Sequence, residues 1–342
     1  MQYKYVIIMC FFALNTLAQN GGDGVFLFSN IDHSPRVQSL GGSAIAFYDN
    51  DVSISSNVPS LLNEKMNNQI AFTFGDYFSD INLVSFSFSK EFEKIGFLGL
   101  SLNSINYGNF ERFSNEGYYE GDFSASDQII SFGVARKISD KLSFGVNFNF
   151  LNSSYETYNA QALTSNISTT YINNDKNFTA TFLVKNLGRQ INNYSSELES
   201  IDYDIQIGIS KELLYLPFKY HLTYTNLNNF DISSPYKLGY QTNVQTGQLE
   251  VKEETIAKTF LRHIIIGGEL NPYKKSLFLR GGFNFQRRFD LTDVYIPSAV
   301  GFSFGVGFRA FSYYFDYSRS FYHLSAITNN FSITTNLRNF GF

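Results

Sequence analysis

The feature that most constrains this 342-residue chain is a repeated alternation of apolar and polar residues. In residues 83–90, LVSFSFSK, Val84, Phe86 and Phe88 alternate with serines. Successive side chains of a strand point to opposite faces of a sheet, so such a segment is an amphipathic β-strand. Residues 142–150 (LSFGVNFNF), 203–210 (YDIQIGIS), 218–225 (FKYHLTYT) and 277–286 (LFLRGGFNFQ) repeat the pattern. We predict fourteen strands after residue 68, centred near residues 73, 86, 100, 131, 147, 167, 181, 207, 222, 264, 281, 304, 316 and 332.

The chemistry of the two faces indicates where such strands fold. The polar face carries Ser, Thr, Asn, Gly and Gln, whereas the apolar face is dense in Phe, Leu, Ile and Val. Only 16% of the residues are charged, while 18% are aromatic. The bilayer core offers no water, so every backbone polar group must pair within the protein, which a closed sheet achieves. The sequence therefore predicts an all-β fold: a transmembrane antiparallel β-barrel of about 14 strands in the cell outer membrane.

The connections between the strands alternate in length. Short connections are expected at residues 90–94, 137–141, 173–177, 211–217, 271–276 and 309–312. Longer ones are expected at residues 106–125, 188–200 and 228–258, whereas the short link at 155–159 is an exception. Outer-membrane barrels have short periplasmic turns and longer extracellular loops. The barrel is therefore expected to start and end in the periplasm, with an even number of strands.

The N-terminal residues predict export. Lys4 precedes an apolar stretch, Tyr5–Leu14, and small residues at Thr16 and Ala18 fit cleavage after residue 18. The one cysteine, Cys10, lies within this segment, so the mature chain would form no disulfide. We expect residues 1–18 to be a signal peptide, 19–66 an N-terminal plug in or beneath the lumen, and 67–342 the barrel. Phe342 is expected to close the last strand.

Residues 301–310, GFSFGVGFRA, match two functional motifs at once. Gly301–Gly305 fits G-x-S-x-G, the nucleophile elbow of hydrolases, and Gly305–Ala310 fits G-x-G-x-x-A, a dinucleotide fingerprint. Both motifs require a helix after the glycines, but the alternation continues unbroken through this segment. We interpret the glycines and Ser303 as the lumen face of a strand. We predict no catalytic, cofactor-binding or metal-binding residues and a protein that is not an enzyme.

Other polar residues give weaker signals. The histidines, His33, His221, His263 and His323, lack metal-ligand spacing. Asp49 and Asp51 are interpreted as a solvated turn, with weak cation binding as the alternative. Arg287 and Arg288 begin a predicted outer loop, where they either are solvated or pair with lipopolysaccharide phosphate. The net charge is −4 and no basic block occurs, which argues against nucleic-acid binding.

Residues 34–63, SPRVQSLGGSAIAFYDNDVSISSNVPSLLN, resemble the plug signature of outer-membrane barrels related to the fatty-acid transporter FadL. That signature has an arginine, Leu-Gly-Gly, an acidic residue, and Asn-Pro-Ala-x-Leu. Here Val58 separates Asn57 from Pro59, and Ser60 replaces the alanine. The resemblance implies a FadL-like barrel of fourteen strands. The matching residues are Arg36, Leu40, Gly41, Gly42, Asp49, Asp51, Pro59 and Leu62.

Residues 281–291 (GGFNFQRRFDL) and 316–337 (DYSRSFYHLSAITNNFSITTNL) are similar to PorQ-like proteins of the Bacteroidota type IX secretion system. This resemblance implies a non-enzymatic barrel that anchors a PorZ-like surface protein in the attachment complex, alongside the sortase-like peptidase PorU and PorV. Its other contacts would be outer-membrane lipid and lipopolysaccharide. The alternative is a FadL-like channel for hydrophobic small molecules. That function needs an apolar site in the lumen, and most of the predicted lumen faces are polar. We also expect the long aromatic loops, chiefly Asn228–Lys258, to dock the partner.

Overall fold

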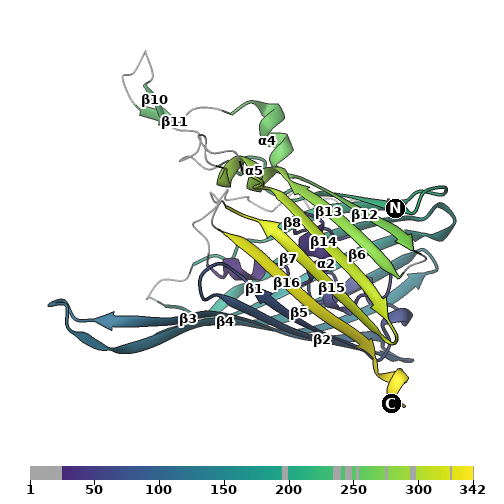
Figure 1. Ribbon diagram of the computed structural model, residues 1–342, viewed down its shortest axis with the longest axis horizontal. Helices are drawn as coiled ribbons and strands as arrows, with labels where there is room; N and C mark the ends of the chain where they lie inside the picture. The colour runs from purple at the N-terminus through teal and green to yellow at the C-terminus, as the bar shows by residue number, and fades with distance from the viewer. Residues whose placement is uncertain are drawn as a thin grey trace, which may run out of the picture.

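The computed structural model describes residues 25–194, 199–233, 240–242, 249–251, 254–273, 276–292, 298–323 and 326–341. Within them, fourteen antiparallel strands form a closed barrel in which β1 pairs with both β2 and β16 (Figure 1). The predicted fold class is therefore confirmed, and each predicted centre lies in or at the start of a barrel strand. The barrel strands are β1 (Gln69–Asp76), β2 (Asn82–Phe92), β3 (Gly96–Phe113), β4 (Tyr119–Ser139), β5 (Leu142–Tyr155), β6 (Tyr158–Asn173), β7 (Phe178–Asn192), β8 (Asp204–Glu212), β9 (Phe218–Tyr224), β12 (Ile264–Tyr273), β13 (Leu277–Asn284), β14 (Phe302–Ala310), β15 (Tyr313–Phe321) and β16 (Ile327–Asn336).

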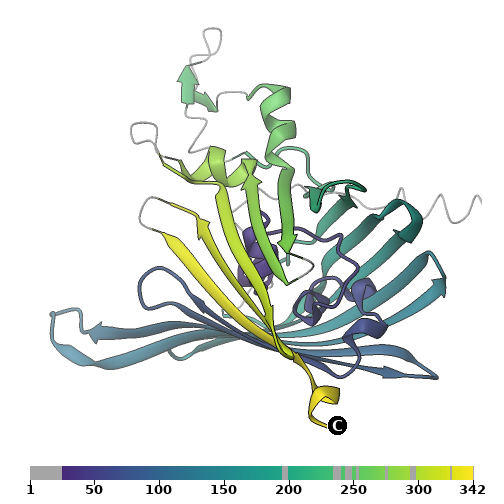
Figure 2. The same cartoon turned by 45° about the vertical axis from the view of Figure 1, so that its right-hand side comes forward.

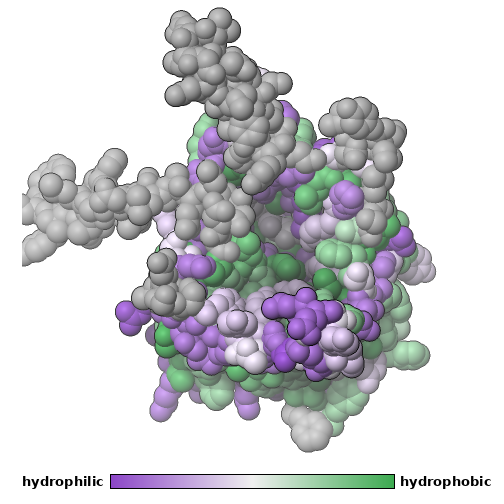
Figure 3. Space-filling view, turned by 90° about the vertical axis from the view of Figure 1, so that its left-hand side faces the viewer, coloured by the Kyte–Doolittle hydropathy of each residue, from purple (hydrophilic) through white to green (hydrophobic). Residues whose placement is uncertain are grey.

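The alternation in the sequence is the alternation of exposure in the structure. In β2, Ser85 and Ser87 face the lumen and are buried, whereas Val84 and Phe86 are exposed on the outside. Figure 3 shows hydrophobic residues along the flanks of the barrel and hydrophilic residues at the rim nearest the viewer. A closed barrel with an apolar exterior satisfies its backbone polar groups and meets lipid with its side chains. The protein is therefore located in the outer membrane.

Short turns lie at one end of the barrel and most of the longer connections at the other, as predicted. One expected loop is largely strand instead, and so is the first part of another. Residues 106–125 belong mainly to β3 and β4, whose hairpin projects far beyond the rim, with only 114–118 between the strands (Figure 1). Residues 188–192 extend β7. The pairing of β3 with β4 continues past two bulges. The sequence did not reveal this longer pairing, because polar and aromatic residues are mixed in the segment without a regular alternation.

The connection after β9 contains structure of its own. A two-stranded sheet of β10 (Tyr240–Thr242) and β11 (Leu249–Val251) precedes helix α4 (Ile256–Arg262). Helix α5 (Phe285–Leu291) follows β13. The remaining parts of the predicted docking loop, 234–239, 243–248 and 252–253, lie outside the described residues. None of the described helices is long and apolar enough to cross a membrane.

The segment before β1 lies inside the barrel (Figure 2). We call residues 25–66 the hatch. It consists of short helical pieces: η1 (Leu27–Asn30), α2 (Pro35–Ser39), η2 (Val52–Ser56), η3 (Pro59–Leu61) and η4 (Glu64–Met66). The predicted signal peptide, 1–18, and residues 19–24 lie outside the described residues.

The end of the chain differs from the expectation. The last strand ends at Asn336 and is followed by a 3-10 turn, η6 (Leu337–Phe340), in place of a strand that runs to the final residue. The Asn336 side chain accepts a hydrogen bond from the backbone N–H of Arg338 and so caps this turn. Phe342 itself lies outside the described residues.

Candidate functional site

The hatch meets the barrel wall at glycines, because backbone approaches backbone there. A Cβ atom added to Gly282 would lie 2.2 Å from the amide nitrogen of Gly41. One added to Gly145 would lie 2.5 Å from the carbonyl carbon of Pro59, and one added to Gly305 would lie 2.4 Å from the Cβ of Ser39. Only glycine leaves room for these contacts. The glycines on the lumen face therefore provide the space into which the backbone of the hatch fits.

Ser303, the residue of the apparent nucleophile elbow, binds the hatch. It lies on β14, which runs straight through the motif, so no elbow forms and no helix follows. Its hydroxyl accepts a hydrogen bond from the N–H of Gly41 at 3.0 Å and donates one to the carbonyl of Ser39 at 3.1 Å. This agrees with the interpretation of the motif as a lumen face. The serine satisfies the backbone of the sharp turn at Leu40–Gly42, where Gly41 and Gly42 have φ of 100° and 92°.

A buried ionic network joins the hatch to three strands. The guanidinium of Arg36 donates two hydrogen bonds of 3.1 Å to the carboxylate of Glu269 on β12 and lies 2.7 Å from Asp49. Glu269 also pairs with Arg280 on β13 at 2.7 Å, and Arg280 pairs with Asp316 on β15. The bidentate geometry gives the docked hatch a fixed position. The resemblance had singled out Arg36 and Asp49, but their partners on the strands were not predicted.

This network borders a cavity of about 360 Å³ at the end of the barrel with the short turns. The cavity wall carries several charges of both signs beside aromatic side chains such as Phe178, Phe218 and Phe278. Such a lining suits water and ions better than an apolar compound. Its charged residues include Arg36, Asp49, Asp51, Lys65, Glu212, Lys219, Glu269, Arg280, Arg309 and Asp316.

Asp49 and Asp51 differ in their electrostatics. Burial would raise the pKa of Asp49, but the guanidinium of Arg36 and the charge of Lys219 hold it below its usual value. Asp51 is 4.0 Å from Arg36, and burial raises its pKa to about 6 against the weaker attraction of that arginine. The interpretation of the two aspartates as a simple solvated turn is therefore wrong. They are half-buried at the cavity wall and pair with Arg36 in the network that docks the hatch.

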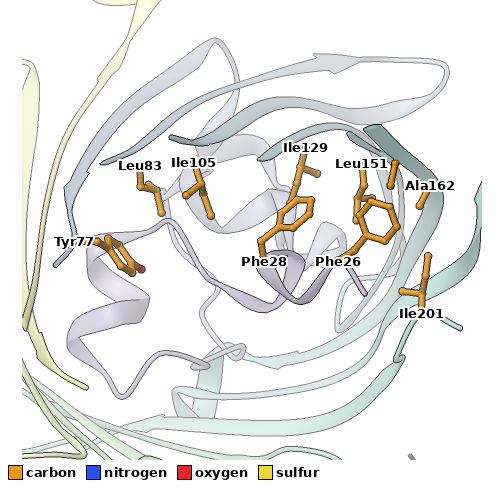
Figure 4. Packing of buried hydrophobic residues seen from close by; sticks show 10 residues of the cluster. Phe26, Phe28, Tyr77, Leu83, Ile105, Ile129, Leu151, Ala162 and Ile201 are labelled. Atoms are coloured by element: carbon orange, nitrogen blue, oxygen red, sulfur yellow. The ribbon is translucent and has the colours of Figure 1, made fainter. Parts of the chain in front are cut away.

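An apolar cluster lines one side of the outer lumen, along β2–β6, a feature that the sequence analysis missed (Figure 4). There Phe28 packs toward Ile129 of β4, and Phe26 packs toward Leu151 of β5. The sequence did contain a sign of this cluster. Its strand residues occupy lumen-facing positions of the alternation, and they lie at the same end of the barrel. We call this set the outer apolar cluster: Phe26, Phe28, Tyr77, Leu83, Ile105, Ile129, Leu151, Ala160, Ala162 and Ile201.

The four histidines do not converge. His33 is buried in the hatch, and burial lowers its pKa to about 4, so it is neutral. His221 lies beneath the ring of Phe47, with ring centroids 4.7 Å apart. His263 bonds the backbone carbonyls of Thr225 and Phe230, while His323 lies between β15 and β16. In the part of the chain that the structure describes, no group of three or more His, Cys, Asp or Glu residues is arranged to hold a metal ion.

The two arginines of the predicted outer loop have structural contacts. The guanidinium of Arg287 stacks over the ring of Tyr322 at 4.0 Å, and its atoms lie against Gly42 of the hatch. Arg288 donates a hydrogen bond to the carbonyl of Ser298 at 2.7 Å. Both belong to α5, whose cap is the side chain of Asn284. Arg287 therefore connects the outer loop to the hatch.

No protein-family model and no curated protein sequence matches this chain. Several solved structures have a similar fold. CymD, a monoaromatic hydrocarbon channel, is 12% identical with a TM-score of 0.53, covering 90% of this chain and 98% of its own. The toluene transporter TbuX of Ralstonia pickettii is 11% identical with a TM-score of 0.51, covering 90% and 99%. A deletion mutant of the TodX monoaromatic hydrocarbon channel is 12% identical with a TM-score of 0.51, covering 89% and 97%. The chain thus has the barrel fold of these transporters and channels.

Proposed function

We propose that this protein is an outer-membrane channel for small hydrophobic compounds. The observation that carries the proposal is the outer apolar cluster. Channels for polar solutes have a polar lumen throughout. Here one side of the outer lumen is apolar, and two aromatic side chains of the protein's own hatch, Phe26 and Phe28, pack there.

These phenylalanines mark a site that suits an aromatic ligand. Burying one such side chain contributes about 1.5–3 kcal/mol. Both rings are almost fully buried, at 6% and 7% exposure, and their centroids are 5.9 Å apart. A small hydrophobic molecule that displaces either ring makes similar contacts with Ile129 and Leu151. The fold neighbours, which are named as toluene and monoaromatic hydrocarbon channels, agree with this ligand class.

The docked hatch lies between this site and the periplasmic end. Next to the cluster is a cavity of only about 10 Å³, where Ile129 and Leu151 meet polar groups such as Asn57, Asn149 and Asn186. This space is too small for a hydrophobic compound while the hatch is docked. Passage therefore requires movement of the hatch segment at Phe26–Ile31, with the network around Arg36 holding the remainder.

The test is binding of 2-phenylethanol to the protein in lipid nanodiscs, measured by equilibrium dialysis with lipid-only discs subtracted. The double variant Phe26→Ala/Phe28→Ala empties the cluster, so it should bind at least several-fold more tightly than the wild type. The control, Phe72→Ala/Phe74→Ala, removes two rings from the lipid-facing side of β1 and should bind like the wild type. Absence of binding in both the wild type and the first variant would contradict the proposal.

A second candidate is the attachment scaffold for a PorZ-like partner with PorU and PorV. The observation that favours it is the projecting β3–β4 hairpin, which presents the exposed aromatics Phe110, Phe113, Tyr118 and Tyr119. Aromatic side chains of this kind anchor protein interfaces. Affinity purification from detergent-solubilised outer membranes tests it. Recovery of a sortase-like peptidase that is lost when residues 109–123 are deleted would favour the scaffold, whereas purification without a protein partner would favour the channel.

A further inference from the structure

Asp127 differs from Glu269 and Asp316, the barrel-wall carboxylates of the ionic network. It lies on the lumen face of β4, where it is 1% exposed. Glu269 and Asp316 are paired with arginines, but no Lys, Arg or His of the described residues is bonded to Asp127. Its contacts are hydroxyl groups. A carboxylate removed from water is costly unless it is hydrogen-bonded or paired with a cation.

Three hydroxyls converge on this carboxylate. The phenol of Tyr107 donates to Oδ2 at 2.5 Å, the phenol of Tyr155 donates to the same oxygen at 3.0 Å, and Ser153 donates to Oδ1. An ionised carboxylate has about four acceptor positions. Three donors leave one position for a further N–H or O–H group. The arrangement stabilises a negative charge and leaves it without a compensating positive one.

Tyrosine rings surround the same point. The ring centroids of Tyr107 and Tyr155 are 5.9 Å apart, and those of Tyr155 and Tyr194 are 5.7 Å apart. These three rings are only partly buried, so they border the outer mouth of the lumen above the carboxylate. The face of an aromatic ring attracts a cation within about 6 Å. A carboxylate under several tyrosines is therefore suited to an ammonium group.

The charged position adjoins the outer apolar cluster. Asp127 is in register with Ile105 on β3 and with Ser153 on β5. Tyr107 and Tyr194 pack directly against the cluster. A molecule with its apolar part between Phe26 and Leu151 would thus place a polar end close to Asp127. This polar end extends the ligand class beyond pure hydrocarbons.

We infer that the outer lumen site selects hydrophobic amines: the apolar cluster holds the apolar part, and Asp127 with Tyr107 and Tyr155 holds the ammonium group. This inference rests on the proposed function, because it concerns the same site. The protonated amine donates a hydrogen bond to the carboxylate and lies over the tyrosine rings. A neutral compound of the same shape forms the apolar contacts alone.

The experiment compares three matched probes with the full-length protein in nanodiscs at pH 7: 2-phenylethylammonium, 2-phenylethanol and 3-phenylpropanoate. Hydrogen bonds to charged groups correspond to a gain of about tenfold or more in affinity, so the cation should bind at least about tenfold more tightly than the neutral alcohol. The anion should bind most weakly. In Asp127→Asn, which keeps the shape and an acceptor oxygen, the cation and the alcohol should bind within about twofold of each other.

Asp122→Asn is the matched control. Asp122 also accepts a hydrogen bond from a tyrosine, Tyr119 at 2.9 Å, but on the exposed hairpin. The Asp122→Asn variant should prefer the cation over the alcohol to the same extent as the wild type. If Asp127→Asn does not insert, Tyr155→Leu keeps the carboxylate, removes one ring and one donor, and should lower the preference severalfold.

The outcomes separate the two proposals. If the alcohol binds and the cation binds no better in the wild type, the amine selectivity is wrong while the hydrophobic channel stands. The same conclusion follows if Asp127→Asn retains the tenfold preference. If none of the probes binds to the wild type or to Phe26→Ala/Phe28→Ala, both proposals fall. Tenfold selectivity that disappears in Asp127→Asn, falls severalfold in Tyr155→Leu and is unchanged in Asp122→Asn supports the inference.

Discussion

A single methyl group added at residue 282 should loosen the hatch from the barrel wall. In Gly282→Ala the new Cβ would lie 2.2 Å from the nitrogen of Gly41 and 2.3 Å from the carbonyl carbon of Leu40. Both are backbone atoms, so no side chain can rotate away. Ordinary contact begins near 3.4 Å, and the turn would therefore have to move by roughly 1.2 Å, the difference between 3.4 and 2.2.

The magnitude follows from what that shift disrupts. Overpacking costs about 1–3 kcal/mol. The hydrogen bond from Gly41 to Ser303, now 3.0 Å, would also break, and a buried N–H without a partner costs about 1–3 kcal/mol. Partial relaxation makes the two costs overlap, so we expect a loss of about 2–4 kcal/mol in hatch docking. That corresponds to roughly a 30- to 700-fold shift toward the undocked hatch.

Tryptic cleavage after Arg36 measures undocking. This residue is 6% exposed while the hatch is docked, so it is protected there. In the regime where docking equilibrates faster than cleavage, the cleavage rate follows the undocked population. The control is Gly281→Ala, one residue away, whose new Cβ would meet no atom closer than 4.0 Å. Equal cleavage rates for Gly282→Ala and Gly281→Ala would refute the close-approach argument.

Three further predictions concern the same docking interface, with single-channel conductance in planar bilayers as the measure of an opened lumen. Arg36→Ala leaves buried carboxylates without their partner and should cost about 3–5 kcal/mol, whereas Arg112→Ala, which breaks an exposed ion pair, should cost about 1 kcal/mol or less. The pKa of Asp51, about 6 in the docked hatch, lies above its ordinary value of 3.8, so the contribution of Asp51 to docking should be largest below pH 4 and should be lost as the pH rises through 6. The buried neutral His33 acts in the opposite direction in the wild type and in Asp51→Asn alike, so the check is the ratio of their open probabilities, which should fall between pH 7 and pH 5. Ser303→Ala should cost about 1–3 kcal/mol and raise the open probability, and an unchanged conductance would count against its role at Gly41.

The sequence located every strand of the barrel, because strand formation in a membrane depends on a local pattern. In each of the fourteen segments the alternation itself indicates which residues face the lipid and which face the lumen. The short turns lie where this alternation stops. The two motifs in residues 301–310 could be rejected on the same ground. The hairpin of β3 and β4 was mistaken for a loop, because its pairing beyond the rim depends on the neighbouring strand and on no burial pattern of its own.

The local pattern of residues is thus enough to predict the membrane barrel, its short turns and a segment that precedes it. The filling of the lumen depends instead on contacts between residues far apart in the chain. Gly41 and Ser303 are 262 positions apart, and Arg36 and Glu269 are 233 apart. The outer apolar cluster and the carboxylate of Asp127 likewise come together only because the strand register aligns residues from neighbouring strands at one height. A period of two specifies which side a residue faces, but barrel closure specifies what it faces across the lumen.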